Sequence, residues 1–162
     1  MKTPHQAACI IRRVTEEFGA FSNMSRHPVT HEGVVWPRAE HLFQALRFAP
    51  DHDARERIRA QKNPMAAKWL AKTLLSEAVV VPRSPGDLDN MRLVLRLKCD
   101  QHAPVRCLLE STKGRLIVED CTARPNESGL FWGAAWEVNG SVQGQWRGLN
   151  WLGRLWTELR GA

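Results

Sequence analysis

The chain has 162 residues, 43% of them hydrophobic, and a formal net charge of +6 at pH 7. This length predicts one domain, residues 1–162, with an ordinary buried core. No hydrophobic run reaches the length of a membrane span, and the first residues lack the features of a secretory signal. The basic charge favours anionic partners, such as nucleic acid, nucleotides or phosphorylated metabolites, without choosing among them.

The cysteines are scattered and form no CxxC pair: Cys9, Cys99, Cys107 and Cys121. This spacing argues against a zinc ribbon or a disulfide scaffold, and it predicts a protein of the reducing cytoplasm. His27 and His31 are four residues apart, but Pro28 interrupts any helix between them and no third ligand follows. We therefore predict no metal site and no bound cofactor.

The first half of the chain is predicted to alternate short strands with helices. Ile10–Val14 and Val34–Trp36 are predicted strands, and Pro37 starts a helix that contains Glu40. Two further helices are expected, over Ala54–Gln61 behind the cap residues Asp51 and Asp53, and behind Pro64, where hydrophobic residues recur with helical spacing.

The second half is predicted to be largely helical as well. One helix carries Leu88, Met91, Leu95 and Cys99 on its inner side, and a shorter one runs from Pro104 to near Ser111. Leu116–Val118 is a predicted buried strand, and a loop rich in tryptophan and glycine leads to a last helix. The buried residues of that last helix are predicted to be Leu152, Leu155, Trp156 and Leu159. These elements predict a mostly helical α+β fold with a few short strands.

The helix over residues 39–48 has the most informative polar pattern. Glu40, Gln44 and Arg47 lie in line on it, beside a hydrophobic face. A carboxylate, an amide and a guanidinium in this order can hold a ligand that has both hydroxyl and phosphate groups. The alternative is a surface helix with a solvated Glu–Gln–Arg stripe.

Two later segments also have residues suited to binding. Glu119–Gly133 is predicted to be a long loop after a strand, and its Trp132 could stack on a nucleobase or simply fill the core. Gly148 and Asn150 precede the last helix, where free backbone N–H groups would form a phosphate cradle or Asn150 would act as a plain N-cap. No Walker A loop, Rossmann fingerprint, GxSxG elbow, zinc finger or RNP motif is present.

Taken in order, several segments resemble the NADAR family. Phe18–Asn23, Glu32–Pro37 and Glu40–Ala45 resemble its opening motifs. Its closing motifs are resembled by three further segments: Ile117–Asp120, Phe131–Gly133 and Gly148–Leu155, followed by Leu159–Arg160. The resemblance extends over residues 18–160. It implies a mostly helical single-domain fold and cleavage of the bond between a ribose carbon and a nitrogen.

The resemblance also implies roles for individual residues. Glu40 is the first choice for a carboxylate that stabilises the oxocarbenium-like transition state, with Asp120 and Glu119 next. Trp132 would stack on the base. The other residues expected at the substrate are Phe21, Ser22, Asn23, His41, Gln44, Arg47, Arg124, Gly148 and Asn150.

A covalent route through a lysine Schiff base is the alternative mechanism. Many family members have lysine where this chain has Arg47, which cannot act as that nucleophile but can pair with phosphate in a bidentate manner. Lys98 is at another lysine-bearing family position, so it is the candidate nucleophile, unless it is only a solvated helix lysine.

The resemblance leaves the substrate open. The favoured reading is removal of ADP-ribose from ADP-ribosylated guanine in nucleic acid, because of the basic charge, with a DNA ADP-ribosyltransferase as functional partner. The alternatives are hydrolysis of phosphorylated riboflavin-biosynthesis intermediates and, in another class, a non-catalytic ADP-ribose or NAD sensor. A sensor would be expected to lack the carboxylate or the tryptophan, and this chain has both Glu40 and Trp132.

Overall fold

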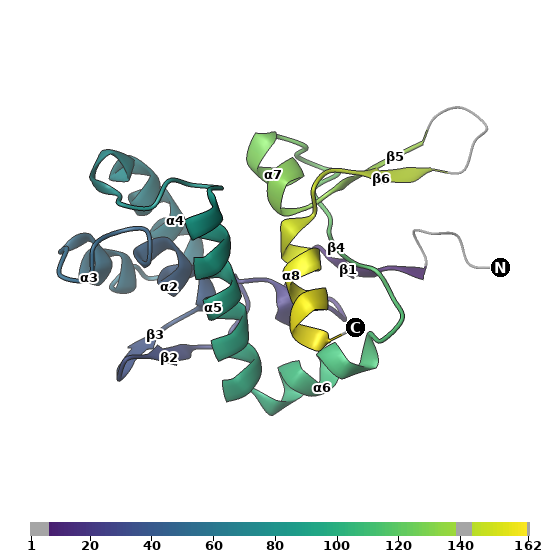
Figure 1. Ribbon diagram of the computed structural model, residues 1–162, viewed down its shortest axis with the longest axis horizontal. Helices are drawn as coiled ribbons and strands as arrows, with labels where there is room; N and C mark the ends of the chain where they lie inside the picture. The colour runs from purple at the N-terminus through teal and green to yellow at the C-terminus, as the bar shows by residue number, and fades with distance from the viewer. Residues whose placement is uncertain (1–6, 139–143, 162) are drawn as a thin grey trace. The chain divides into compact units, whose positions relative to one another are not determined.

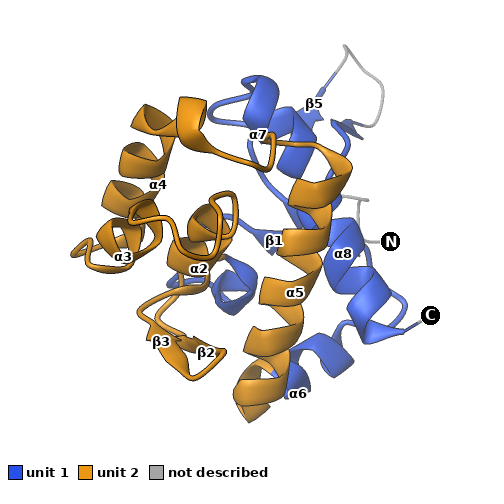
Figure 2. Cartoon of the chain, turned by 60° about the vertical axis from the view of Figure 1, so that its left-hand side comes forward, with its two compact units in different colours: residues 1–22, 106–162 blue, residues 23–105 orange. Residues whose placement is uncertain are grey.

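The computed structural model describes residues 7–138 and 144–161 (Figure 1). The chain divides into two compact units, coloured separately in Figure 2. Unit 1 consists of residues 1–22 and 106–162, and unit 2 of residues 23–105. Unit 1 is thus built from both ends of the sequence, and the middle of the sequence forms unit 2.

Unit 2 is mainly helical (Figure 1). Its elements in chain order are β2 (Val29–His31), β3 (Val34–Trp36), α2 (Ala39–Ala45), α3 (Ala54–Arg59), α4 (Pro64–Thr73), the 3-10 turn η2 (Leu75–Glu77) and α5 (Pro85–Gln101). β2 and β3 form an antiparallel hairpin in which Val29 pairs with Trp36. Both residues of its two-residue turn, Glu32 and Gly33, have positive φ, as a hairpin turn that matches strand twist requires.

Side-chain caps and prolines fix where the two longest helices of unit 2 begin. The Asn63 side chain accepts a hydrogen bond from the Ala66 N–H at 2.8 Å, and Pro64 is the first residue of α4. The Ser84 hydroxyl accepts from the Asp87 N–H at 3.3 Å at the start of α5, again followed by proline. Proline suits this position because its missing N–H would have no partner there.

Helix α2 lies at the centre of unit 2. All seven of its residues are buried, and the helix packs against α3, α4 and α5. The alternative of a solvated surface stripe is therefore wrong. The polar side chains of α2 must find partners inside the unit, because an unpaired buried polar group is costly.

Unit 1 has short strands and a long C-terminal helix. Its elements are β1 (Cys9–Ile11), the 3-10 turn η1 (Gly19–Phe21), β4 (Ile117–Glu119), α7 (Glu127–Trp132), β5 (Ala135–Glu137), β6 (Gln145–Arg147) and α8 (Trp151–Arg160); the unit boundary falls within α6 (Ala103–Ser111). β1 pairs with β4 in parallel, and β5 pairs with β6 antiparallel.

Helix α8 supplies much of the core of unit 1. It packs against β4 and buries Leu152, Leu155 and Trp156, as predicted. The Trp156 ring lies 4.8 Å from the Phe21 ring, centroid to centroid, and its indole N–H donates to the Phe21 carbonyl at 3.1 Å. Leu159, the fourth residue of the predicted stripe, is only half-buried.

The predicted fold class, α+β and mostly helical with short strands, is confirmed. The differences concern short elements: β2, β5 and β6 were not predicted, and the predicted loop after β4 contains α7. The first strand ends at Ile11 rather than Val14. Within the described residues, no helix has both the length and the hydrophobicity needed to cross a membrane.

Candidate functional site

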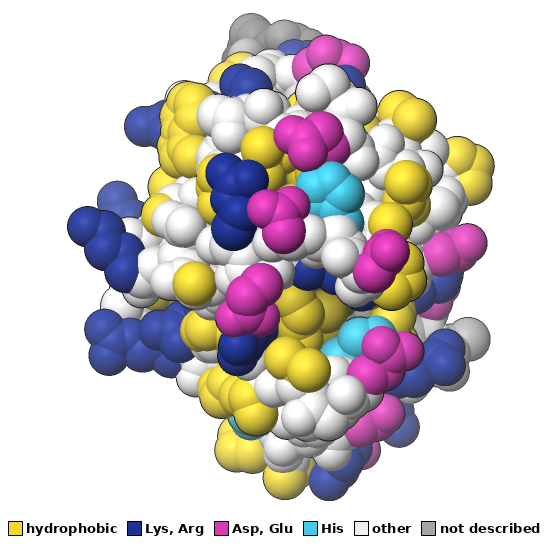
Figure 3. All heavy atoms as spheres, turned by 90° about the vertical axis from the view of Figure 1, so that its left-hand side faces the viewer, with side chains coloured by type: hydrophobic (Ala, Val, Ile, Leu, Met, Phe, Trp, Pro, Cys, Tyr) yellow, Lys and Arg dark blue, Asp and Glu magenta, His cyan; other side chains and the backbone are white. Residues whose placement is uncertain are grey.

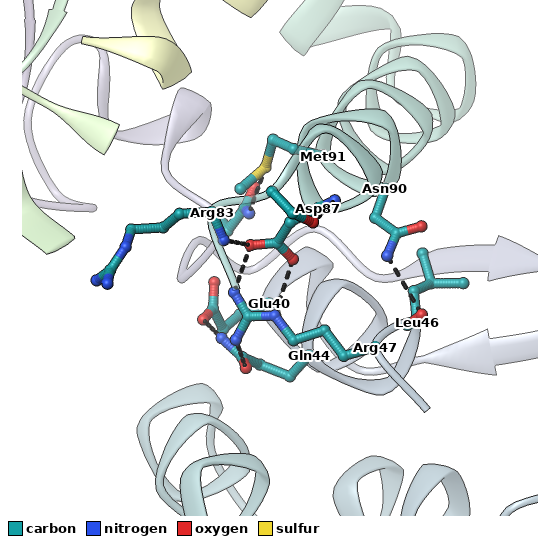
Figure 4. Close-up of polar contacts among 10 residues, drawn as sticks. Glu40, Gln44, Leu46, Arg47, Arg83, Asp87, Asn90 and Met91 are labelled. Atoms are coloured by element: carbon teal, nitrogen blue, oxygen red, sulfur yellow. Dashed lines mark hydrogen bonds and ion pairs between the residues drawn. The ribbon is translucent and has the colours of Figure 1, made fainter. Parts of the chain in front are cut away.

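A chain of buried polar side chains joins α2 to α5 in unit 2 (Figure 4). The Gln44 amide donates to the Glu40 carboxylate at 2.7 Å and accepts from Arg47 at 2.7 Å. Arg47 also binds both oxygens of Asp87, each at 2.8 Å. The predicted alignment of Glu40, Gln44 and Arg47 is therefore present, and it continues to Asp87.

This network of hydrogen bonds explains how the buried Arg47 is stabilised. Asp87 is fully buried, and it accepts the two Arg47 bonds and a third from the Arg83 backbone N–H at 2.7 Å. Figure 4 shows the Arg83 side chain pointing away from this network. A bidentate guanidinium–carboxylate pair with further hydrogen bonds offsets the desolvation of both charges.

Glu40, at the other end of the network, keeps one carboxylate oxygen available. The side chain is 6% exposed, and Oε1 accepts from Gln44. In the part of the chain that the structure describes, no hydrogen bond reaches Oε2. Glu40 thus combines a carboxylate held in place by Gln44 with an oxygen that can act on a ligand.

Asn23 lies directly beside Glu40. Its backbone carbonyl accepts a hydrogen bond from the Glu40 N–H at 3.1 Å, and its side-chain N–H donates to the Met91 sulfur at 3.2 Å. Its side-chain oxygen is buried and has no hydrogen-bond partner among the described residues. Such an acceptor is rare in native proteins and calls for an explanation, for which a ligand donor is suitable.

Lys98 is fully buried on α5, contrary to the alternative of a solvated helix lysine. Its ammonium donates to the Ser25 hydroxyl at 2.7 Å, and the same hydroxyl lies 2.9 Å from Nδ1 of His27. Burial lowers the pKa of Lys98 to about 7, so a large fraction of the amine is neutral at physiological pH. Burial, followed by the charge of Lys98, lowers the pKa of His27 to about 4.

Because its pKa is lowered, the His27 ring is neutral at physiological pH, and Nδ1 accepts from the Ser25 hydroxyl in one tautomer and donates to it in the other. In both cases the Ser25 oxygen accepts from Lys98. Asp87, Met91 and Lys98 follow one another along the buried side of α5. The buried side of α5 therefore holds three side chains in place: Asp87 binds Arg47, Met91 accepts from Asn23, and Lys98 donates to Ser25.

Two more predicted residues of unit 2 have structural partners. The His41 ring nitrogen Nε2 contacts the Gln61 carbonyl at 3.0 Å, and burial lowers the pKa of His41, so the ring is neutral at physiological pH. Among the described residues, the Arg47 guanidinium contacts Asp87, Gln44 and the Phe43 ring. The geometry thus favours a positioning role for Arg47 over the predicted phosphate contact.

In unit 1, the predicted carboxylates and the tryptophan lie around the end of β4 and on α7. Glu119 ends β4, and Asp120 accepts a hydrogen bond from the Thr122 N–H at 2.8 Å in a local turn. Trp132 is half-buried at the end of α7, its ring 4.9 Å from Phe131 in an edge-to-face arrangement. Arg124 is exposed. All four side chains stay candidates.

Phe21 and Asn150 have structural roles that were not predicted. Phe21 is fully buried against Trp156, and Ser22 follows it at the end of η1. The Asn150 side chain accepts from the Glu119 N–H at 3.0 Å and donates to the Ile117 carbonyl at 2.7 Å. Asn150 thus ties the start of α8 to β4 and forms no side-chain cap.

Two backbone N–H groups at the predicted phosphate cradle already have partners in the protein. The N–H groups of Leu149 and Asn150 donate to the carbonyls of Leu130 and Gly133, at 2.7 and 3.0 Å. A Cβ on Gly148 would lie 2.5 Å from the Gly133 carbonyl oxygen. Gly148 therefore serves close backbone packing, and its φ of 145° is one that other residues rarely adopt.

Sequence reasoning missed Ser25 and Asp87. Asp87 occupies the third position after the Ser84 cap, where an acid reads as a first-turn residue of α5. Lys98 was identified through the family resemblance, and its spacing of seven residues from Met91 is consistent with a place on the buried side of α5. Ser25 has no comparable signal, because only the fold brings it to α5. No three metal-ligating side chains cluster within residues 7–138 and 144–161.

Comparisons with known proteins agree with this architecture. The family model of the NADAR domain matches residues 10–162. The chain is 34% identical to N-glycosidase YbiA of Escherichia coli over 146 residues, which cover 90% of this chain and 82% of the relative. It is 31% identical over 156 residues to the maize protein named riboflavin biosynthesis protein PYRR, chloroplastic, covering 88% of this chain and 23% of that protein.

The fold has a solved counterpart. The NMR structure of E. coli YbiA superimposes with a TM-score of 0.67 at 31% identity, covering 94% of this chain and 83% of that one. The match of the family model spans almost the whole sequence and includes both units. The chain therefore belongs to the NADAR domain family.

Proposed function

We propose that this protein is an N-glycosidase that hydrolyses a ribose–nitrogen bond, with Glu40 as the carboxylate that faces the ribose. As the bond breaks, its electron pair leaves with the nitrogen and positive charge develops on the ribose ring. A fixed carboxylate beside that charge lowers the barrier. Water then adds to the ribose carbon, and the proton that it loses goes to the nitrogen that has left.

The observation that carries the proposal is a pair of acceptors without donors in the described part of the chain, the buried side-chain oxygen of Asn23 and one carboxylate oxygen of Glu40. Asn23 Oδ1 accepts no hydrogen bond from the described residues, and neither does Glu40 Oε2. Two neighbouring acceptors suit two donors, which the vicinal hydroxyls of ribose provide. Gln44 and Arg47, fixed by Asp87, keep the Glu40 carboxylate oriented before any ligand binds.

Lys98 offers a covalent alternative. Its neutral amine would attack C1 of the ring-opened ribose, which is joined to the base nitrogen as an imine. The base would leave as its free amine while the lysine takes its place in the imine, and addition of water would then release the aldehyde form of the ribose and return the lysine amine. A pKa of about 7 suits such a nucleophile. Its complete burial under Ser25 means that the segment around Ser25 must move before a substrate reaches the amine, so the Glu40 route has the stronger support.

For the substrate, we infer ADP-ribosylated guanine in nucleic acid, in keeping with the net charge of +6. The natural partner of such an enzyme is a DNA ADP-ribosyltransferase, whose modification it would reverse. A phosphorylated riboflavin precursor is the second candidate, favoured by the name of the maize relative. Both substrates contain a ribose bonded to nitrogen and at least one phosphate.

The test is to incubate the protein separately with guanine-ADP-ribosylated DNA and with phosphorylated riboflavin intermediates, following release by mass spectrometry. Glu40→Gln should lower kcat by about 100-fold to 1,000-fold, equivalent to about 3–4 kcal/mol, with binding retained. Glu56→Gln, on the exposed α3 pair with Arg59, is the matched control and should leave kcat unchanged. Tight ADP-ribose binding without cleavage of either substrate would identify a sensor instead.

A further inference from the structure

The outer face of α4 has a composition unlike the other exposed helix faces of unit 2. Met65, Lys68, Trp69 and Lys72 recur at i, i+3, i+4 and i+7, so they lie on one side of the helix. Met65 is 50% exposed and Trp69 60%. The opposite side, with Ala67 and Ala71, is buried where α4 packs against α2 and α3.

The α4 lysines differ from the exposed arginines of neighbouring helices in having no acidic partner. On α3, Arg59 pairs with Glu56 at 2.6 Å, and on α5, Arg92 pairs with Asp89 at 2.9 Å. Helix α4 contains no acid, and neither Lys68 nor Lys72 forms an ion pair with any described residue. Lys72 instead lies 5.2 Å from the centre of the Trp69 ring.

We propose that this outer face of α4 docks single-stranded nucleic acid. Trp69 stacks on a base, and Lys68 and Lys72 neutralise the phosphates on either side of it. Single-stranded nucleic acid offers a flat base for the exposed indole and phosphates for the two lysines, which have no acidic partner among the described residues. A hydrophobic protein partner would have to desolvate the two ammonium groups, and an acidic peptide would leave the indole without a flat partner.

The proposal rests on the proposed function and narrows its substrate class. Helix α4 packs directly on α2, the helix that carries Glu40, so the docking face and the candidate carboxylate belong to one unit. The nucleotides next to a modified guanine would bind to α4. These extra contacts would give modified nucleic acid a higher affinity than a free nucleotide. Figure 3 shows Lys and Arg side chains at the left edge of this side of the molecule, and others in its centre and at its right among acidic ones.

The experiment measures binding of an unmodified, fluorescein-labelled single-stranded DNA 12-mer by anisotropy over a salt series. Trp69→Ala is expected to weaken binding about tenfold. Lys68→Ala/Lys72→Ala should weaken it further and lower the salt slope by about 1.4, since each phosphate contact to a single strand contributes about 0.7. The double variant Arg106→Ala/Lys113→Ala removes the same charge elsewhere on the surface and should bind like wild type.

Three outcomes overturn the docking proposal. Wild-type protein does not bind the 12-mer at low salt, the two α4 variants bind as tightly as wild type, or the control variant loses as much affinity as the lysine variant. A change in sedimentation of Trp69→Ala with unchanged DNA binding would assign the face to self-association instead. Alanine favours helix, so these exposed substitutions preserve α4, which circular dichroism verifies.

The same variants separate this proposal from the proposed function. Binding of DNA through α4 without hydrolysis of any substrate would leave the docking face standing and remove the enzyme. Hydrolysis of free phosphorylated riboflavin precursors, unaffected by Trp69→Ala, together with no DNA binding, would keep the glycosidase and remove the docking face.

Discussion

The two halves of the family signature serve different physical purposes in this protein. In α2, the signature residues Glu40 and Gln44 belong to a buried polar network with acceptors to spare. In unit 1, the signature residues Gly133, Gly148 and Gly153 provide close backbone approach, and Asn150 is used up by two backbone partners. A motif can therefore identify a family equally well through chemistry or through packing.

The largest effect on stability is expected from Gly153→Ala, which tests the signature residues that serve packing in unit 1. A Cβ there would lie 2.1 Å from the Ile117 carbonyl oxygen, a backbone atom that cannot move aside alone. We expect a loss of about 3 kcal/mol or more in the free energy of unfolding, measured by urea denaturation. Gly86→Ala on α5 is the matched control, because its nearest neighbour would be 3.4 Å away. Equal losses in both variants would contradict the packing role.

Lys98→Met tests the buried polar residues of unit 2 through the pH dependence of stability. Burial lowers the pKa of Lys98 to about 7, whereas an unfolded lysine titrates near 10.4, so between these values the unfolded chain binds more protons and wild-type stability rises with pH. Methionine removes this dependence. We expect the variant to be about 3 kcal/mol more stable than wild type at pH 6, after loss of the Ser25 bond, and the difference to shrink toward pH 10.

The same substitution tests the covalent route. Borohydride trapping of an adduct should increase with pH up to about 7 in wild type and be absent in Lys98→Met. An advantage in stability that does not vary with pH would show that Lys98 titrates normally. A trapped adduct in the methionine variant would place the nucleophile on another lysine.

Two substitutions of Asn150 separate the contribution of its backbone conformation to stability from the contribution of its side-chain hydrogen bonds. Asn150 has a φ of 52°, which glycine adopts freely and alanine does not. Asn150→Gly should cost about 2 kcal/mol for the two bonds to β4, and Asn150→Ala about 1 kcal/mol more. Thermal or urea unfolding measures both. If instead KM rises and stability is unchanged, Asn150 contacts substrate as first predicted.

The smallest effect is expected from Arg47→Lys. Lysine keeps the charge but cannot span both oxygens of Asp87 while also reaching Gln44, so we expect a loss of about 1–2 kcal/mol in stability. KM for a phosphorylated substrate should stay near the wild-type value. A large rise in KM with full stability would restore the predicted phosphate contact.

The sequence predicted the long helices well because their signals are local. Pro64 marks a helix start that the structure reproduces, and the hydrophobic spacing of α8 gave most of its buried face. The strands β2, β5 and β6 were missed, because three residues are too few to show a period-two pattern. β3 is equally short, but Val34–Trp36 are all hydrophobic, whereas each of the missed strands contains at least one polar residue. Helix α7 has only six residues, and its Asn126 cap was its only clear signal.

The site was predictable only along α2. Helical spacing places Glu40, Gln44 and Arg47 in line, but whether that line is solvated or buried depends on α3, α4 and α5 packing around it. The Asp87 partner lies 40 residues away in sequence, and Ser25 lies 73 residues from Lys98. Contacts at such separations follow from the fold, so composition and periodicity do not reveal them.

The unsatisfied oxygen of Asn23 has a consequence for ligand affinity. The free protein already carries the cost of drying this carbonyl, because folding removed it from water without a replacement donor among the described residues. A ligand hydroxyl that donates there recovers a hydrogen bond without a second desolvation of the protein. The unliganded protein is therefore less stable at this position than it would be with a donor present. A bound ribose hydroxyl would remove that cost and so bind more tightly.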